Sequence, residues 1–348
     1  MNKNRYIAAI VGTGRIGFSL GFDKKREQPA SHTMALLKNK RISLIAAADL
    51  NSENLENWLK FVKKHHSKND FTLTFQNSSE LYENVTCLDI ITVAVNEEHH
   101  LEECLKAIEY KPRLVILEKP VALNSEEAEK IRAKAEECGV SVMVNHERRF
   151  ARDYLWARKM LSEIGEIQSV TAELDSGLRI YGKEFEKDGT YSLLHDGTHL
   201  VDIVQFLFGC TLKGAEVTGI HKDEKGIVRN FSAHYSEVSS QSGTIPEITI
   251  KMSGRSKFFE FRIEITGTLG KIVIGNGIAE FYRREESKLY TGFYSLTKQK
   301  IKLPKKTGYF SLMIQNAVDF LDGESELVSP LEDAIADLRT LEEIKAHF

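Results

Sequence analysis

The chain is poor in cysteine and has no long apolar run. Its four cysteines, Cys87, Cys104, Cys138 and Cys210, are separated by 17, 34 and 72 positions, which match no metal-binding or redox motif. We therefore expect reduced thiols, as in cytoplasmic proteins. No apolar stretch reaches 18 residues, so no membrane-spanning helix is expected. No charged-then-apolar leader precedes the first expected strand at residue 6, so we expect a cytoplasmic protein.

The chain also lacks an excess of charge of either sign. Its formal net charge of −3 gives no reason to expect nucleic acid or an anionic membrane as a partner. Hydrophobic residues make up 42% and charged residues 28%, the proportions of a globular protein. Since 348 residues exceed one ordinary core, we expect two domains, 1–123 and 124–348, with the boundary between 120 and 150.

The first 145 residues alternate between short apolar runs and helical patterns. The unbroken apolar runs predict strands that are buried on both faces, at 6–11, 42–48, 89–95, 114–117 and 140–144. The helical patterns lie at 51–66, at 98–109 and from the capping box Asn124-Ser-Glu-Glu127 to Gly139. This alternation predicts an α/β domain with a doubly wound parallel sheet.

From about residue 166 the strands lengthen and alternate in polarity. Phe259, Phe261 and Ile263 alternate with charged residues, which predicts an antiparallel sheet with one packed and one open face. Further strands are expected near 166–175, 214–221, 229–237, 246–252 and 270–275. Helices near 191–208, 310–322 and 331–346 are expected to cover the apolar face of this sheet. The second part is therefore predicted to be an α+β domain with a large open, mainly antiparallel sheet.

A glycine-rich turn follows the first apolar run, in the sequence Gly12-Thr13-Gly14-Arg15-Ile16-Gly17. Gly12 permits a tight turn, Gly14 leaves room for a pyrophosphate, and Gly17 lets the next helix lie close to the strand. The helix N-terminus also favours phosphate. Placed between a strand and a helix, this motif predicts dinucleotide binding; the alternative is an ordinary strand–turn–helix.

Asp49 ends the second apolar run, where an acidic residue accepts hydrogen bonds from the adenosine ribose. Such a carboxylate repels a 2′-phosphate, which favours NAD and leaves NADP as a second possibility. A turn or N-cap aspartate is the alternative, because Asn51 and Ser52 follow. Asp49 lies 32 residues after Gly17, more than the usual ~20, and residues 21–31 are interpreted as an insertion that forms a surface loop.

Several polar residues follow the predicted parallel strands, whose carboxyl ends border the ligand crevice of such a sheet. Asn96 and His99 follow the fourth strand and are candidates for the nicotinamide side, or for helix caps. Glu118-Lys119-Pro120 follows the strand at 114–117, so Lys119 is expected to point into the crevice and bind a substrate hydroxyl.

A second group of polar residues lies in the helical pattern near 191–208. His195, His199 and Asp202 have i, i+4 and i+7 spacing, which places them on one face of a helix. An imidazole titrates near neutral pH and suits the transfer of an alcohol proton. A His-x-x-x-His pair can also bind zinc, but no third ligand has a matching spacing, so no metal is expected. A buried structural histidine is the remaining alternative, more for His195 than for His199.

These motifs together resemble the glucose–fructose oxidoreductase / inositol dehydrogenase (Gfo/Idh/MocA) family. The resemblance covers nearly the whole chain and depends on the glycine turn, Ala-Ala-Asp49, Val95-Asn96, Glu118-Lys119-Pro120, Val144-Asn-His-Glu-Arg-Arg-Phe150 and Gly197-Thr-His199-x-x-Asp202. It implies a Rossmann domain followed by the α+β domain. It also implies that Lys119 and His199 act on the substrate hydroxyl, with His199 as the acid–base group.

The resemblance also marks where the chain departs from the family. The family has aspartate four residues before the helical histidine, whereas this chain has His195, with Asp196 beside it. His195 is then expected to bind the substrate or to relay a proton. Tyr191 is a further pocket candidate, and Arg179 and Tyr181 are weaker ones. One of Arg148 and Arg149 is expected near the substrate, with an interdomain salt bridge as an equal alternative.

The sequence thus predicts an NAD(P)-dependent oxidoreductase that acts on a secondary alcohol or ketone of a sugar, sugar derivative or cyclitol. The candidate cofactor contacts are Gly12, Thr13, Gly14, Arg15, Ile16, Gly17, Asp49, Asn96, His99 and Glu118. The candidate substrate contacts are Lys119, Arg148, Arg149, Tyr191, His195, Asp196 and His199. The alternatives are a non-catalytic dinucleotide-binding regulator and an NAD-dependent glycoside-cleaving enzyme. A homodimer or homotetramer through the open sheet is expected.

Overall fold

A computed structural model describes residues 5–65, 72–177 and 191–348 of the chain. The chain divides into two compact units, one made of Met1–Phe150 and Lys306–Ile335 and the other of Ala151–Lys305 and Ala336–Phe348. No helix in the described ranges is long and apolar enough to cross a membrane.

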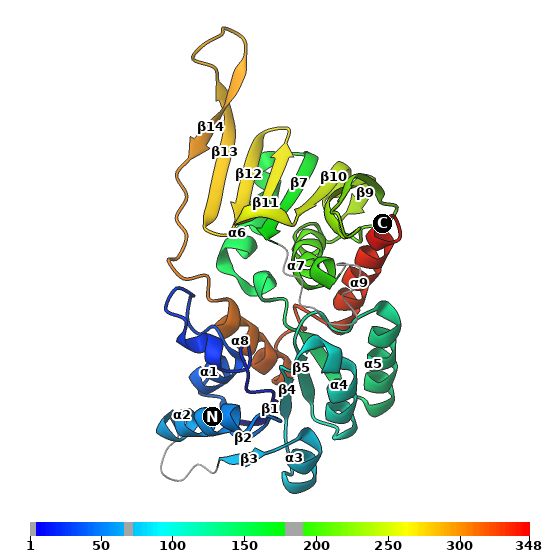
Figure 1. Cartoon of the computed structure of the whole chain (residues 1–348). Coiled ribbons are helices and arrows are strands. Elements are labelled where there is room, and N and C mark those ends of the chain that lie inside the picture. The colour runs from blue at the N-terminus through cyan, green and yellow to red at the C-terminus, as the bar shows by residue number, and fades with distance from the viewer. Residues whose placement is uncertain (1–4, 66–71, 178–190) are drawn as a thin grey trace. The chain divides into compact units, whose positions relative to one another are not determined.

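The first unit contains a six-stranded sheet whose strand pairs are all parallel (Figure 1). Its order is β3-β2-β1-β4-β5-β6. The bounds are β1 (Tyr6–Val11), β2 (Ile42–Ala48), β3 (Leu73–Phe75), β4 (Ile90–Val93), β5 (Leu114–Leu117) and β6 (Ser141–Val144). The predicted doubly wound parallel sheet is therefore confirmed. Because β1 lies between β2 and β4, the connections diverge at its carboxyl end, which is where such sheets bind ligands.

Five helices of this unit connect its strands: α1 (His32–Lys38), α2 (Ser52–His65), α3 (Ser78–Asn84), α4 (His100–Glu109) and α5 (Ser125–Cys138). The ends of α5 follow the predicted signals. The Asn124 side chain accepts a hydrogen bond from the Glu127 amide at 2.9 Å, and Gly139 ends the helix in the left-handed conformation at φ +67°. The Glu127 carboxylate accepts from the Leu123 amide, one residue before the usual capping-box partner.

The helix after the glycine turn is interrupted, as the interpretation of 21–31 as an insertion requires. The amides of His32 and Thr33 donate to the carbonyls of Ile16 and Gly17 at 3.2 and 2.9 Å. Donor and acceptor are 16 residues apart, whereas an α-helix has four, so twelve residues are looped out of an otherwise continuous helix. Without these twelve residues Asp49 would follow Gly17 by the usual ~20 positions, which explains the long spacing in the sequence.

Helix α8 (Tyr309–Leu321) belongs to the first unit, which corrects the prediction that the segment 310–322 covers the antiparallel sheet. Phe310, Met313 and Ile314 are buried in one core cluster with Ile10 of β1 and other residues of that unit. The periodicity correctly gave an amphipathic helix, but periodicity identifies a buried face and not the element that buries it.

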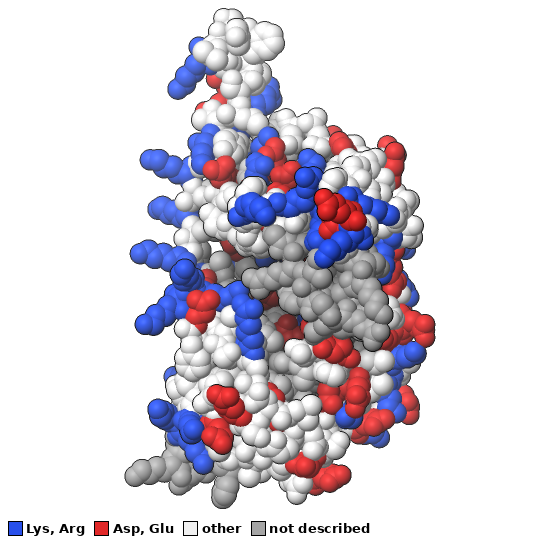
Figure 2. All heavy atoms as spheres, in the orientation of Figure 1, with Lys and Arg blue, Asp and Glu red and all other residues white. Residues whose placement is uncertain are grey.

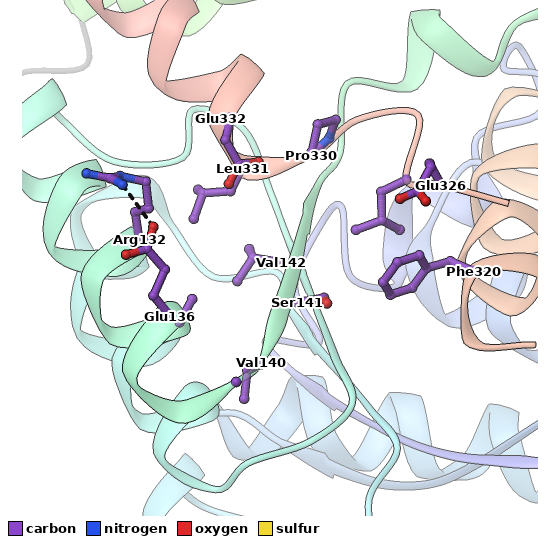
Figure 3. Close-up of a pocket in the computed structure, with 13 residues that line it drawn as sticks. Arg132, Glu136, Val140, Ser141, Val142, Phe320, Glu326, Pro330, Leu331 and Glu332 are labelled. Carbon is purple, nitrogen blue, oxygen red and sulfur yellow. Dashed lines mark hydrogen bonds and ion pairs between the residues drawn. The ribbon is translucent and has the colours of Figure 1, made fainter. Parts of the chain in front are cut away.

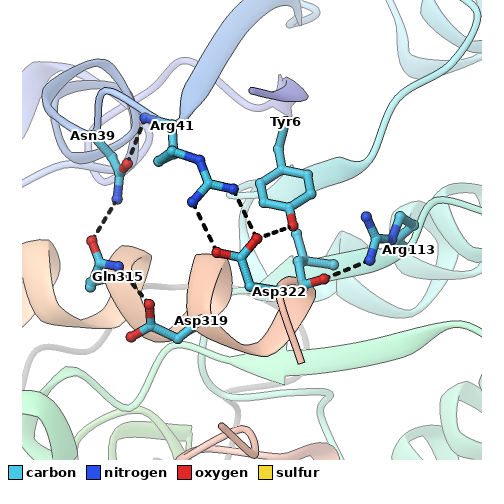
Figure 4. Close-up of polar contacts among 8 residues, drawn as sticks. Tyr6, Asn39, Arg41, Arg113, Gln315, Asp319 and Asp322 are labelled. Carbon is cyan, nitrogen blue, oxygen red and sulfur yellow. Dashed lines mark hydrogen bonds and ion pairs between the residues drawn. The ribbon is translucent and has the colours of Figure 1, made fainter. Parts of the chain in front are cut away.

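A polar network attaches the C-terminal end of α8 to the sheet (Figure 4). The Asp322 carboxylate accepts a hydrogen bond from the Tyr6 hydroxyl at 2.6 Å and two from the Arg41 guanidinium at 2.8 and 2.9 Å. Arg113 donates to the Leu321 carbonyl at 2.7 Å. Burial and the neighbouring Asp322 raise the pKa of Tyr6, so this phenol remains a donor.

The insertion holds the other end of α8. The Glu27 carboxylate accepts hydrogen bonds from the amides of Thr307 and Gly308, both at 2.6 Å, at the start of the helix. The Tyr309 hydroxyl donates to the Glu27 carbonyl at 3.0 Å. The insertion is therefore fastened to the body of the first unit and is not a free surface loop.

The second unit contains an eight-stranded sheet in the order β14-β13-β12-β11-β7-β10-β9-β8 (Figure 1). Only the β7–β10 pair is parallel, and the other neighbours are antiparallel, which confirms the predicted mainly antiparallel sheet. The bounds are β7 (Ile167–Gly177), β8 (Glu216–Lys222), β9 (Val228–Ser240), β10 (Gly243–Ser253), β11 (Arg255–Gly267), β12 (Gly270–Gly275), β13 (Ile278–Glu286) and β14 (Tyr294–Gln299).

Three helices complete the second unit: α6 (Arg152–Met160), α7 (Tyr191–Phe208) and most of α9 (Leu331–Lys345). Helix α7 approaches both β10 and α9 at Gly197, where a Cβ would lie 3.1–3.2 Å from side-chain atoms of Leu341 and Met252. The predictions that 191–208 and 331–346 are helical and belong to this sheet are confirmed.

The sheet face that carries its charged residues is crossed by a ladder of ion pairs. Lys251 of β10 pairs with Glu173 of β7 at 3.2 Å, and Arg262 and Lys271 both pair with Glu264 of β11 at 2.6 and 2.5 Å. Figure 2 shows positive and negative side chains interspersed over the region of these strands. Because charges of opposite sign lie next to one another, these side chains form ion pairs within and between strands while the face stays partly exposed.

Replacing Asp322 with alanine is expected to lower the free energy of unfolding by about 2 kcal/mol, because it removes the acceptor of Tyr6 and Arg41 at a partly buried site. Urea unfolding followed by circular dichroism measures this. Asp319→Ala is the matched control, since the Asp319 carboxylate accepts a hydrogen bond from Gln315 at the exposed surface of the helix, and it should change stability by less than about 0.5 kcal/mol. Equal effects of the two substitutions would contradict the role given to Asp322.

Candidate active site

The glycine turn contains two glycines that the fold itself requires and one that it does not. A Cβ on Gly12, which has φ +93°, would lie 2.5 Å from the Ala94 carbonyl oxygen, and a Cβ on Gly17 would lie 2.0 Å from the Gly12 carbonyl oxygen. A Cβ on Gly14 would meet nothing closer than the Asn54 side chain at 4.0 Å. The open space above Gly14 fits a pyrophosphate, whose approach a side chain there would block.

Thr13 fastens this turn to Asp49 at the end of β2. Both the amide and the hydroxyl of Thr13 donate to one Asp49 carboxylate oxygen, at 2.7 and 2.9 Å. The other oxygen accepts from the Asn51 amide at 2.8 Å. Asn51 and not Asp49 caps α2, because Asn51 accepts the amides of Glu53 and Asn54. The hydrogen bond from the Asn51 amide makes Asp49 a turn aspartate, the other half of the alternative. Asp49 is thus beside the turn, where a dinucleotide would place its adenosine ribose.

The carboxyl end of β4 leads into Asn96 and His99, and both side chains are exposed. Neither caps the helical turn that follows it. The next residue, His100, is buried at 1% exposure, and its Nδ1 lies 2.6 Å from the Pro120 carbonyl oxygen. Burial lowers the pKa of His100 despite this carbonyl contact, which favours the neutral ring.

Glu118 is buried at the carboxyl end of β5, with 5% exposure. Its Oε1 lies 2.5 Å from both His32 Nε2 and Asn145 Nδ2. Burial raises the pKa of Glu118, but the hydrogen bond and charge of His32, the hydrogen bond from Asn145 and the charge of Lys119 outweigh it, so the net pKa is lowered. Glu118 is therefore an ionised carboxylate, and the half-buried Lys119 directly follows it.

In the second unit, α7 carries His195, Asp196 and His199, all half-buried, and the buried Asp202. Because α7 is a continuous helix over Tyr191–Phe208, His195, His199 and Asp202 share one helical face, as their spacing requires. The opposite face of α7 carries Val201, Val204 and Phe208, which are buried, and Leu194, which is half-buried. The side chain of Tyr191, together with Arg179 and Tyr181, lies outside the described residues.

Arg148 and Arg149 follow β6 and differ in their surroundings. Arg149 is 2% exposed, and its guanidinium donates to the Val328 carbonyl at 3.0 Å and pairs with Asp333. Arg148 is half-buried and lies 3.4 Å from Glu147. Asp333 and Val328 belong to the first unit, so this ion pair of Arg149 holds the returning segment 328–333 against that unit.

Two surface hollows of the first unit differ in their distance from these residues. One, of about 420 Å³, adjoins the glycine turn at Thr13 and is walled by Phe18, Phe22 and Phe61, with Lys60 and Lys64 on its rim. The other, of about 480 Å³, lies along the edge strand β6 beside α5 (Figure 3) and contains no predicted site residue. The candidate site is therefore the edge of the sheet that bears the glycine turn and Lys119.

Residues 7–146 match the model of an oxidoreductase family with an NAD-binding Rossmann fold, GFO_IDH_MocA. The matched range is less than half of the chain, and within it the chain is similar to this family. The match agrees with the glycine turn, with Asp49 and with the Glu118-Lys119-Pro120 segment, all of which lie in the matched range.

Two curated relatives are similar to part of this chain. The chain is 30% identical over 132 residues to scyllo-inositol 2-dehydrogenase (NADP(+)) IolW of Bacillus subtilis, covering 36% of each protein. It is 29% identical over 188 residues to glucose-6-phosphate 3-dehydrogenase of the same organism, covering 51% of this chain and 50% of that protein. The chain therefore spans half or less of the length of these relatives.

The likeness in fold extends further than the likeness in sequence. A dehydrogenase from Chromobacterium violaceum superposes with a TM-score of 0.78 at 16% identity, over 99% of this chain and 96% of that one. At this identity the likeness shows the fold alone.

The buried polar residues around the Glu118–Pro120 segment that sequence reasoning missed include His32, His100 and Asn145. Asn145 directly follows a predicted strand, so the argument that selected Lys119 and Asn96 could have selected it. His100 is the neighbour of the chosen His99. Nothing in the sequence pointed to His32, because it contacts Glu118, which is 86 residues away.

Gly14→Ala is expected to weaken dinucleotide binding by about tenfold or more, because the methyl group occupies the space predicted for the pyrophosphate, while the fold tolerates it. Fluorescence titration with NADH measures the affinity. Gly17→Ala is the contrasting variant: its Cβ would clash with the Gly12 carbonyl, so it should lower the unfolding temperature. Wild-type NADH affinity in folded Gly14→Ala would remove the turn from the cofactor site.

Proposed function

We propose that this chain is an NAD(P)-dependent oxidoreductase that transfers a hydride between nicotinamide C4 and a secondary alcohol or ketone carbon. The observation that carries this proposal is the open space at Gly14 beside the Thr13–Asp49 pair, on the same sheet edge as Lys119. A bound dinucleotide would be held by the glycine turn and Asp49, and it supplies the hydride acceptor or donor. The Asp49 carboxylate disfavours a 2′-phosphate and so favours NAD over NADP.

Lys119 and His199 are proposed to act on the substrate oxygen. In the oxidative direction the carbinol carbon loses a hydrogen with its electron pair, the hydroxyl proton passes to His199, and the carbon–oxygen bond becomes a carbonyl. Lys119 donates a hydrogen bond to the oxygen as negative charge develops on it. A half-buried imidazole suits the proton acceptor, since its ordinary pKa is near neutrality.

His195 and Asp196 take the place of the aspartate that the family has four residues before the helical histidine. We propose that His195 binds a substrate hydroxyl or relays the proton from His199, one helical turn away. Tyr191, Asp196, Arg148 and Arg149 are proposed as further substrate contacts. The names of the related enzymes, an inositol and a glucose phosphate dehydrogenase, support a sugar, sugar derivative or cyclitol as the substrate.

Lys119→Ala and His199→Ala are expected to lower turnover at least about a thousandfold and to leave dinucleotide affinity unchanged. Absorbance at 340 nm with NAD or NADP and a panel of sugars and polyols measures the turnover. Lys130→Ala and His221→Ala are the matched controls, because both residues are exposed and neither is a proposed site residue. Full activity of either active-site variant would refute its assigned role.

The same panel separates the two alternative functions. A dinucleotide-binding regulator would bind NAD and change no absorbance with any substrate. A glycoside-cleaving enzyme that uses NAD transiently would release sugar from glycosides without a net absorbance change.

We also propose that the chain forms a homodimer or homotetramer through the charged face of the eight-stranded sheet. The ion-pair ladder carries both signs, so the face can pair with a second copy of itself. Sedimentation velocity is expected to give a multiple of the 39.4 kDa chain mass. The double variant Arg262→Glu/Lys271→Glu should yield a monomer, whereas Lys130→Glu should not. A monomeric wild-type protein at micromolar concentration would contradict this proposal.

A further inference from the structure

Two buried histidines contact the residues on either side of Lys119, one at a side-chain carboxylate and the other at a backbone carbonyl. His32, the first residue of α1, is 0% exposed, and its Nε2 lies 2.5 Å from the Glu118 carboxylate. His100, the first residue of α4, contacts the Pro120 carbonyl through Nδ1 at 2.6 Å. The residues before and after Lys119 are therefore each held by an imidazole that comes from a different helix.

The protons of these contacts follow from the acceptors. An ionised carboxylate only accepts hydrogen bonds, so His32 carries its proton on Nε2. The two ring nitrogens of His100 both face carbonyl oxygens, Nδ1 that of Pro120 at 2.6 Å and Nε2 that of Val95 at 3.2 Å, so the shorter contact favours the proton on Nδ1. Asn145 donates its amide to the same Glu118 oxygen at 2.5 Å. Glu118 thus receives two donors on one oxygen.

This cluster is costly for a purely structural purpose. Burying a carboxylate requires compensation by hydrogen bonds and opposite charge, and an apolar group of similar volume is often as good or better for stability. Here the opposite charge comes first from His32 and then from Lys119, and both lower the pKa of Glu118. One of the two groups that the buried carboxylate attracts is therefore the residue that we propose to be catalytic.

We propose that His32 and His100 are positioning residues for Lys119. His32 holds the Glu118 carboxylate in its ionised form and in one orientation, and His100 holds the Pro120 carbonyl. Together they restrict the backbone at Lys119, so that its ammonium group is presented at the carboxyl edge of the sheet. We call the contacts of His32 with Glu118 and of His100 with Pro120 the clamp. The role of Lys119 depends on the proposed function, but the existence of the clamp does not.

The link from His32 also reaches the glycine turn. The His32 amide donates to the Ile16 carbonyl at 3.2 Å, while its ring contacts Glu118. One residue therefore connects the turn proposed to hold the cofactor to the segment that carries Lys119. The looped-out insertion places His32 at this point, because the helix resumes with it.

Three variants test the role of His32. His32→Leu removes the donor and is expected to lower kcat about tenfold or more through misplacement of Lys119, with an unchanged Kd for NADH. His32→Gln keeps an N–H donor and should recover most of the activity. In the double variant His32→Leu/Glu118→Gln, the loss should be smaller than the product of the two single losses, because the two residues act as a pair.

Thr33→Val is the matched control. Thr33 is the buried neighbour of His32 and bonds to Gly17 and Trp58, not to Glu118. It should lower stability without a change in kcat. An equal loss of kcat in Thr33→Val, or no rescue by His32→Gln, would overturn the positioning role and leave His32 as a packing residue.

A readout that does not need enzymatic activity separates this inference from the proposed function. Acetylation of Lys119 by acetic anhydride, followed by mass spectrometry, measures how available its amine is. At a fixed pH, Lys119 should be acetylated about threefold faster in His32→Leu than in wild type. Without the His32 donor Glu118 is protonated more readily, and a neutral carboxyl does not attract the ammonium form. Thr33→Val should not change the rate.

The outcomes of the two tests are distinct. A changed labelling rate with fully active Lys119→Ala would keep the clamp and reject the catalytic role of Lys119. An unchanged labelling rate in folded His32→Leu would reject the clamp, whatever the activity. Should His32→Leu fail to fold, Glu118→Gln and Asn145→Leu test the same carboxylate by the same labelling measurement, and wild-type rates in both would reject the clamp.

Discussion

Two hydrogen bonds from Thr13 to Asp49 fix the position of the glycine turn in the first unit. Thr13 donates both its amide and its hydroxyl to a single oxygen of Asp49, and so joins the turn after β1 to the end of β2. This attachment sets the separation between the turn and the carboxylate whatever lies between them in sequence. The twelve looped-out residues can therefore interrupt the helix without moving the glycine turn or the Asp49 carboxylate.

The carboxyl edge of the parallel sheet contrasts with its centre. The strands β4 and β5 are buried and almost wholly apolar, yet directly beyond β5 lie a buried carboxylate, two buried imidazoles and a buried amide. Each is held by a short hydrogen bond to a neighbour in this cluster. Hydrogen bonds of this kind gain strength from the low local dielectric, although His32 Nδ1 and Asn145 Oδ1 are buried without a hydrogen-bond partner among the described residues. The rigidity of the Lys119 segment and the ionisation of Glu118 are therefore two results of one arrangement.

The sequence predicted the elements whose signals are local and strong. The apolar runs at 6–11, 42–48, 114–117 and 270–275 correspond to strands with the same bounds. The three-residue strand β3 has no period to detect, and β13 and β14 carry so many polar residues that alternation is lost. The segment 310–322 was correctly predicted as a helix but wrongly placed on the antiparallel sheet, since amphipathicity does not name a partner.

The candidate site was predictable where its residues directly follow the carboxyl end of a parallel strand. Gly12, Gly14, Gly17, Asp49 and Lys119 were found by this rule, because parallel strands bring their carboxyl ends to one edge. His32 could not be found, since its contact with Glu118 depends on how the chain folds back after the insertion. The roles of the α7 histidines come from the family resemblance and stay a prediction.

The return of α8 to the first unit has a consequence for the synthesis of the protein. Phe310, Met313 and Ile314 complete a core whose other members begin at Tyr6, so this unit cannot close until α8 has been translated, about 300 residues after β1. Until then the nascent chain exposes the apolar surface that α8 later covers. The second unit, most of which is translated in between, is the one that can assemble its sheet first.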